Sequence, residues 1–262
     1  MHHPLRQLKR RLDPDLLAQG AVLMAAAAQL ATAAMGSRSR SGRPPVGEVS
    51  NSLDLPLAPA NGTFAIWGPL YAGSLALAAY QASPALRTDP LLRRVRLPFA
   101  LACAGNAAWV PLFTSRHYTG ALGAILSTLA GSSIAYARAS SAGTLTPTQA
   151  SLVRAPVGAL SGWISVATPS AVTAAVTSGQ RSGESSGRPR WPVPVVAAVT
   201  TLAAAVNRRL PASLSYPAAV TWGLAGLAAN HDARGDVRTA AAVGAAVLVA
   251  AALASRAATA SA

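Results

Sequence analysis

The sequence predicts an all-α fold, a polytopic bundle of transmembrane helices. Of the 262 residues, 52% are hydrophobic and only 11% are charged, whereas about a quarter of the residues of a soluble domain carry a charge. The apolar residues fall in blocks of about 20, the length that an α-helix needs to cross the hydrocarbon core of a bilayer. Short segments rich in Arg, Pro, Gly and Ser separate the blocks, as loops separate the helices of a multi-pass membrane protein.

Eight such blocks are expected to form membrane-spanning helices. Each is free of charge inside except at its boundaries, so ion-coupled transport through a relay of buried ionisable groups is not expected. The sixth and seventh are among the shortest, close to the minimum of about 17 residues for a span. The predicted spans are residues 16–36, 62–81, 97–113, 119–137, 152–178, 192–207, 214–230 and 237–255.

The first block allows two interpretations. Four basic residues precede it within a basic N-terminal tail, and the sequence Ala31-Thr32-Ala33 lies near its end, as in a cleaved signal peptide. However, the block has about 21 residues, which is longer than the hydrophobic region of about 7 to 15 residues in such peptides. The length favours an uncleaved first helix.

The second block places an aromatic anchor at its start. Trp67, Pro69 and Tyr71 fall in the first turns of the predicted helix, where aromatic rings meet the boundary between membrane and water. Pro69 lies close enough to the start of the helix to be tolerated. By itself this stretch is only a span with an anchor.

Two later blocks repeat the pattern of a lone tryptophan among small apolar residues, with Trp109 in the third and Trp163 in the fifth. Together with Trp67 they could line one aromatic-walled pocket. Alternatively, each is an interfacial residue or core filler. Asn106 lies one turn before Trp109 on the same helix face. Because a buried amide in lipid must find a partner, Asn106 is expected to make either a helix–helix hydrogen bond or a ligand contact.

The remaining features concern organisation. Residues 180–190 are polar and rich in Gly and Ser, which is typical of a flexible junction. With eight spans both ends of the chain lie on the same side, and 13 of the 22 Lys and Arg residues fall there. This small excess favours a cytoplasmic N-terminus.

In the fifth block, Gly158 and Gly162 have the spacing that permits a neighbouring helix to approach closely.

Several function classes are excluded. The net charge is +14, but the arginines are spread a few per loop and form no basic face interleaved with aromatic residues, so no nucleic acid partner is expected. Cys103 is the single cysteine, which leaves no disulfide framework and no thiol metal site. The four histidines lack metal-ligand spacing, and His231 beside Asp232 lies at a predicted helix end, where a solvated loop is expected rather than a catalytic dyad. No hydrolase, phosphate-loop or dinucleotide motif is present, so no catalytic residue, metal or cofactor is expected.

Three segments carry a resemblance to a known family. The segments FAIWGPLYAG (64–73), GNAAWVPLF (105–113) and GWISVAT (162–168), the last preceded by Arg154, resemble motifs of the translocator protein family, TspO/MBR, also called tryptophan-rich sensory proteins. They follow one another in the family's order and at similar separations, in positions that correspond to its second, third and fifth helices. The resemblance covers roughly residues 16–178.

The resemblance implies a five-helix bundle that encloses a pocket for porphyrins, sterols and synthetic amphipathic ligands. Trp67 and Trp163 match the tryptophans of the family's second and fifth helices that are thought to face a bound tetrapyrrole. Asn106 and Trp109 match residues of the third helix that line the same cavity, and Tyr71 belongs to the second-helix motif. The expected ligand-binding residues are therefore Trp67, Tyr71, Asn106, Trp109 and Trp163.

The chain also departs from the family pattern. Pro169, Ser170 and Ala171 stand where an asparagine usually follows the fifth-helix tryptophan, and the fourth-helix tryptophan of many members is absent. Three functions stay open. The first is binding, sensing or transport of a small hydrophobic or amphipathic ligand, either tetrapyrrole or sterol-like. The second is a membrane interaction or assembly module with a vestigial pocket, and the third is a light-dependent porphyrin-degrading enzyme.

The protein is expected to be a multi-pass protein of the cell membrane. Its expected partners are the lipid bilayer, the ligand and, because translocator relatives tend to dimerise, a second copy of the chain. In the C-terminal part, Trp191 and Trp222 are expected to be interface anchors. The expected units are a basic tail (1–15), a TspO-like five-helix core (16–178), a polar linker (179–191) and a three-helix C-terminal extension (192–262).

Overall fold

The computed structural model describes residues 13–36, 44–53, 55–177, 190–210 and 213–260. Within these residues the chain is helical and contains no strand, so the predicted all-α class is confirmed. The elements are α2 (Pro14–Gly36), α3 (Val46–Asn51), the 3-10 helix η1 (Asn61–Ile66), α4 (Trp67–Gln81), the 3-10 helix η2 (Pro84–Leu86), α5 (Pro90–Thr114), α6 (Tyr118–Ser140), α7 (Pro147–Gln149), the π-helical turn η3 (Ala150–Arg154), α8 (Ala155–Thr177), α9 (Pro192–Arg209), α10 (Ser215–Ala229) and α11 (Gly235–Ala260).

Every predicted span corresponds to a helix, but the helices differ in length. Five are long and apolar enough to cross a membrane, namely α2, α5, α6, the continuous helix over residues 147–177, and α11. The helices α4 and α10 have 15 residues each, fewer than a full crossing needs. The 3-10 helix η1 leads directly into α4 and lengthens it, so the second predicted span is built from two helix types.

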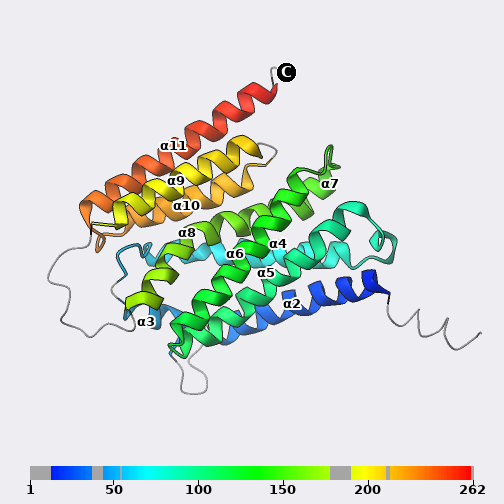
Figure 1. The fold of residues 1–262 in the computed structure, drawn as a ribbon, viewed down its shortest axis with the longest axis horizontal. Coiled ribbons are helices and arrows are strands. Elements are labelled where there is room, and N and C mark those ends of the chain that lie inside the picture. The colour runs from blue at the N-terminus through cyan, green and yellow to red at the C-terminus, as the bar shows by residue number, and fades with distance from the viewer. Residues whose placement is uncertain (1–12, 37–43, 54, 178–189, 211–212, 261–262) are drawn as a thin grey trace, which may run out of the picture.

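Five helices form a closed ring. α2 packs against α5, α5 against α6, α6 against α8, α8 against α4, and α4 returns to α2. The three C-terminal helices lie outside this ring, with α10 on α8, and α11 on both α10 and α9. Figure 1 shows α2 along one side of the molecule and α11 along the opposite side. The five-helix core and three added helices are therefore the observed architecture.

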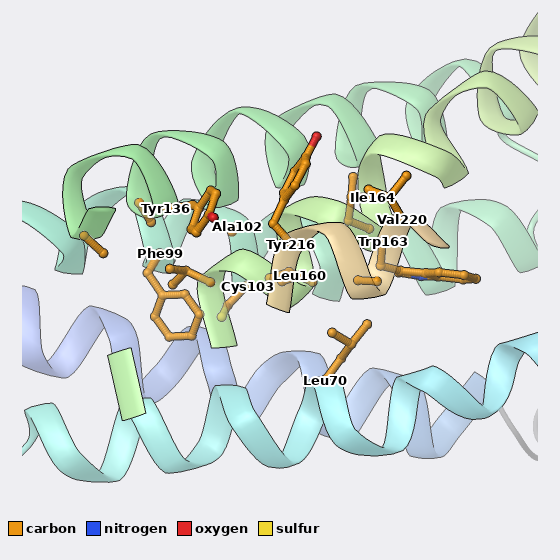
Figure 2. Packing of buried hydrophobic residues seen from close by; sticks show 14 of the residues in the cluster. Leu70, Phe99, Ala102, Cys103, Tyr136, Leu160, Trp163, Ile164, Tyr216 and Val220 are labelled. Atoms are coloured by element: carbon orange, nitrogen blue, oxygen red, sulfur yellow. The ribbon is translucent and has the colours of Figure 1, made fainter. Parts of the chain in front are cut away.

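One continuous hydrophobic core joins the ring to the added helices. Buried residues from α2 through α11 belong to a single cluster. Figure 2 shows Leu70 of α4 pointing toward Leu160 and Trp163 of α8, while Tyr216 and Val220 of α10 meet the same region. Residues 178–189, which hold most of the predicted linker, lie outside the described residues.

Small residues allow the helices to approach closely. A Cβ atom on Gly105 of α5 would lie 2.7 Å from the carbonyl oxygen of Ala124 on α6. A Cβ on Gly162 of α8 would collide with the carbonyl oxygen of Tyr216 on α10, and one on Gly158 with the hydroxyl of Ser215. The predicted close approach at Gly158 and Gly162 is thus observed, with α10 as the partner helix.

A buried polar junction joins α2, α4 and α5 at one end of the ring. Gln19 donates from Nε2 to the carbonyl oxygen of Gln81 at 2.6 Å, and Gln81 donates in return to the carbonyl oxygen of Gln19 at 3.2 Å. Arg96, only 2% exposed, donates from Nε to Oε1 of Gln81 at 3.0 Å and to the carbonyl oxygens of Leu86 and Arg87. Sequence reasoning missed this arginine because α5 begins at Pro90 rather than at residue 97.

Replacement of Arg96 by methionine is expected to lower stability, because the buried Oε1 of Gln81 and the partly buried carbonyl oxygen of Arg87 lose their donor, while the carbonyl oxygen of Leu86 keeps only the amide of Asp89. We expect a loss of about 2 to 3 kcal/mol, measured as a fall of several degrees in the thermal midpoint of the detergent-solubilised protein. Arg94→Met is the matched control, since Arg94 is exposed. Equal midpoints for the two variants would contradict the structural role of the junction.

Candidate functional site

A cavity of about 470 Å³ lies at the end of the ring opposite the polar junction. At this end α2 finishes at Gly36, α4 begins at Trp67 and α5 finishes at Thr114. Residues of the short helix α3 line part of the cavity. The wall is lined mainly by Gly36, Val46, Phe64, Trp67, Tyr71 and Trp109.

Aromatic rings from α4 and α5 form one side of the cavity. Trp67 stacks on Tyr71 with ring centroids 5.3 Å apart and planes inclined by 20°, as the i, i+4 spacing in a helix allows. Trp67 is also nearly parallel to Trp109 of α5, at 6.4 Å and 22°. Phe113 continues the row, with its centroid 5.0 Å from that of Trp109. Trp67, Tyr71 and Trp109 of this row line the large cavity with aromatic side chains, whereas Phe113 lines a smaller hollow.

Trp163 belongs to the same aromatic cluster but does not line the large cavity. Its ring meets Trp67 edge-on at 6.0 Å and 83°, and it is only 2% exposed. It lines instead a second, smaller hollow of about 90 Å³. Phe64 and Trp109 line both spaces and therefore stand between them. The three predicted tryptophans converge, while their contact with a ligand stays a prediction.

Asn106 lies behind the aromatic row rather than on the cavity surface. It is buried on α5 and donates from Nδ2 to Oε1 of Gln29 on α2 at 3.2 Å. Its side chain also interacts with the Tyr71 hydroxyl. Of the two roles that the sequence left open, the structure shows the helix–helix hydrogen bond. Oδ1 of Asn106 and Nε2 of Gln29 have no hydrogen-bond partner among the described residues.

A roof, which we define as residues 55–63 between α3 and α4, closes the smaller hollow. Leu57, Ala58 and Pro59 line that hollow, and Asn61 reaches the large cavity. Helix α3 is held beside the roof by Val49, which is fully buried against Phe113, Tyr118, Ala121 and Ala174. The resemblance pointed to tryptophans, and these aliphatic roof residues carried no comparable signal in the sequence.

The chemistry of the cavity is that of a binding site. None of its lining side chains is charged, and the polar ones, Ser50, Asn51 and Asn61, come from α3 and the start of η1. Among the described residues no group of three or more His, Cys, Asp or Glu side chains could hold a metal ion. The arrangement offers apolar aromatic side chains together with a few uncharged polar groups.

Comparison with known proteins agrees with this architecture. The family model described as TSPO-like protein matches residues 19–254. The chain belongs to the TSPO-like family. No curated protein and no solved structure matches it. The matched segment runs from α2 into α11 and includes the three helices outside the ring. With five helices long and apolar enough to cross a membrane among the described residues, this TSPO-like chain is a multi-pass membrane protein.

The hydrogen bond of Asn106 can be tested by a double-mutant cycle. Asn106→Leu alone is expected to lower the thermal midpoint, because Gln29 loses its partner at a cost of about 1 to 2 kcal/mol. Adding Gln29→Leu is expected to recover part of the loss, since two apolar side chains leave no unpaired group. Strictly additive losses would show that the two side chains are not coupled.

Proposed function

We propose that this TSPO-like protein binds a flat hydrophobic or amphipathic small molecule, of the porphyrin class, in the 470 Å³ cavity. The observation that carries the proposal is the row of nearly parallel rings of Tyr71, Trp67 and Trp109 beside that cavity. Sensing or transport of such a molecule would both begin with this binding step.

Size and chemistry support a conjugated macrocycle. The cavity falls within the range of about 300 to 1,000 Å³ that is usual for small-molecule sites. Indole rings stack favourably on a flat π-system, which a sterol lacks. The uncharged polar side chains of Ser50, Asn51 and Asn61 lie at one edge of the cavity, where they suit the polar rim of an amphipathic ligand. A porphyrin fits this combination better than a sterol.

Protoporphyrin IX is therefore expected to quench the tryptophan fluorescence of the purified protein in a saturable manner. Trp67→Ala combined with Trp109→Ala is expected to weaken binding at least about tenfold, because two stacking surfaces of about 1 kcal/mol each are lost. Binding is best followed by the absorbance of the porphyrin itself, since the variant loses two of the five fluorophores.

The matched control is Trp191→Phe, which also removes an indole but at an exposed position preceding α9. Its affinity for protoporphyrin IX is expected to equal that of the natural chain. If the Trp67 and Trp109 double variant binds as tightly as this control, the assignment of the site is wrong. A Trp163→Ala variant then measures whether the ring that meets Trp67 edge-on contributes to binding.

A second candidate is an assembly module whose cavity holds no ligand. It is favoured by α8, where Ser170 stands in the region of the family's asparagine and donates to the carbonyl oxygen of Leu57 at 3.0 Å. Ser170 lines the smaller hollow, and its hydroxyl is engaged by the roof. A membrane partner that co-purifies with the protein, together with no saturable porphyrin binding, would support this candidate.

A further inference from the structure

The roof is a segment that depends on other elements for its hydrogen bonds. Before η1 begins at Asn61, residues 55–60 form no regular helix, so their main-chain groups lack the partners that a helix supplies. In a membrane protein an unpaired main-chain group is costly, because lipid offers no donor or acceptor. The partners of the roof therefore decide whether it stays closed.

Helix α10 and Asn230, the residue that directly follows it, make three hydrogen bonds to the roof, and Ser170 of α8 makes another to the carbonyl oxygen of Leu57. Nε1 of Trp222 donates to the carbonyl oxygen of Thr63 at 2.8 Å, and Nδ2 of Asn230 donates to that of Ala58 at 2.9 Å. The amide of Ala60 donates to the carbonyl oxygen of Gly226 at 3.0 Å. Three hydrogen bonds thus join the roof to α10 and the residue at its C-terminal end.

Gly226 shows how closely the two elements approach. A Cβ atom at this position would collide with the side chain of Thr63, which is itself only 5% exposed. Only a residue without a side chain permits this contact. The roof and α10 are therefore fitted to one another by packing as well as by hydrogen bonds.

Helix α10 has a separate anchor in the ring. Its first half packs on α8 at Gly158 and Gly162, and Tyr216 stacks on Tyr136 of α6 with ring centroids 5.5 Å apart. These contacts involve no residue of the roof. Release of the roof would therefore leave α10 docked, so the roof contacts can open without unfolding the helix.

We propose that α10 and the adjoining Asn230 hold the roof in place over the cavity. Trp222 and Asn230 are then positioning residues that set how long a ligand stays bound. This inference rests on the proposed function. The roof reaches both hollows, since Ala58 lines the smaller one and Asn61 lines the large cavity. By linkage, a ligand that favours the closed roof also stabilises the contacts between the roof and α10. Occupancy of the cavity is thereby coupled to the three C-terminal helices.

The test uses the full chain in lipid nanodiscs and the double variant Trp222→Phe, Asn230→Asp. The first change keeps an aromatic ring and removes its N–H group. The second removes the donor to Ala58 but keeps the oxygen that accepts from the amide of Asp232. Two readouts are measured: hydrogen exchange of the amides in residues 55–66 without ligand, and the dissociation rate of protoporphyrin IX followed by its own absorbance.

Both rates are expected to rise about tenfold in the double variant, and Gly226→Ala is expected to act in the same direction by displacing Thr63. The controls are Asn207→Ala and Ser255→Ala. Asn207 on α9 is a buried amide that donates to the hydroxyl of Ser255 on α11. This contact joins α9 to α11 away from the roof, so roof exchange and dissociation are expected to match those of the natural chain.

The outcomes separate the two proposals. If the natural chain binds no protoporphyrin IX, the proposed function fails, and the exchange measurement still decides whether α10 holds the roof. If the natural chain binds but the double variant shows the exchange and dissociation rates of the controls, the proposal that α10 and Asn230 hold the roof is wrong, while the assignment of the binding site stands. Faster exchange with an unchanged dissociation rate would also overturn the positioning role, because the roof would then open without affecting the ligand.

Discussion

The cavity depends on a difference between the two ends of α2, α4 and α5: these helices are joined by hydrogen bonds at one end only. At one end of the ring, Gln19, Gln81 and Arg96 tie α2, α4 and α5 together with hydrogen bonds between buried groups. At the other end these helices present Gly36, Trp67 and Trp109 to an open space. Buried polar groups in an apolar environment are strongly held, because no water can replace their partners. The junction therefore closes one end of the ring, while the aromatic end stays wide enough for a cavity.

The aromatic row follows from helix geometry once the ring is closed. Trp67 and Tyr71 are four residues apart on α4, as are Trp109 and Phe113 on α5, so each pair stacks along its own helix. Trp67 and Trp109 then meet across the ring, although α4 and α5 are not neighbours in it, and this contact aligns the two pairs. Asn106 donates a hydrogen bond to Gln29 on α2. Packing and polar contacts together hold the rings in one cluster.

The three C-terminal helices are part of the same molecule in structural terms. They share its hydrophobic core, and the TSPO-like family model extends through them. Their contact with the ring is made mostly through α10, which packs on α8, and the same helix reaches the roof beside the cavity. Because α10 contacts both the ring and the roof, it can couple ligand binding in the cavity to the C-terminal helices. Such coupling needs only that α10 contacts the roof differently in the ligand-free and ligand-bound states.

Much of the fold was determined by the sequence alone. Blocks of apolar residues specified the eight helices, because burial of main-chain groups in lipid leaves few alternatives to a helix. The lone tryptophans of three blocks, Trp67, Trp109 and Trp163, left open whether they share one pocket or are separate interfacial or core residues. Only the tertiary structure decided which of these rings faces the large cavity, that Asn106 binds Gln29, and that Trp222 donates to Thr63 instead of serving only as an anchor. Such contacts join residues far apart in the chain, and hydrophobic periodicity carries no information about which helix faces which.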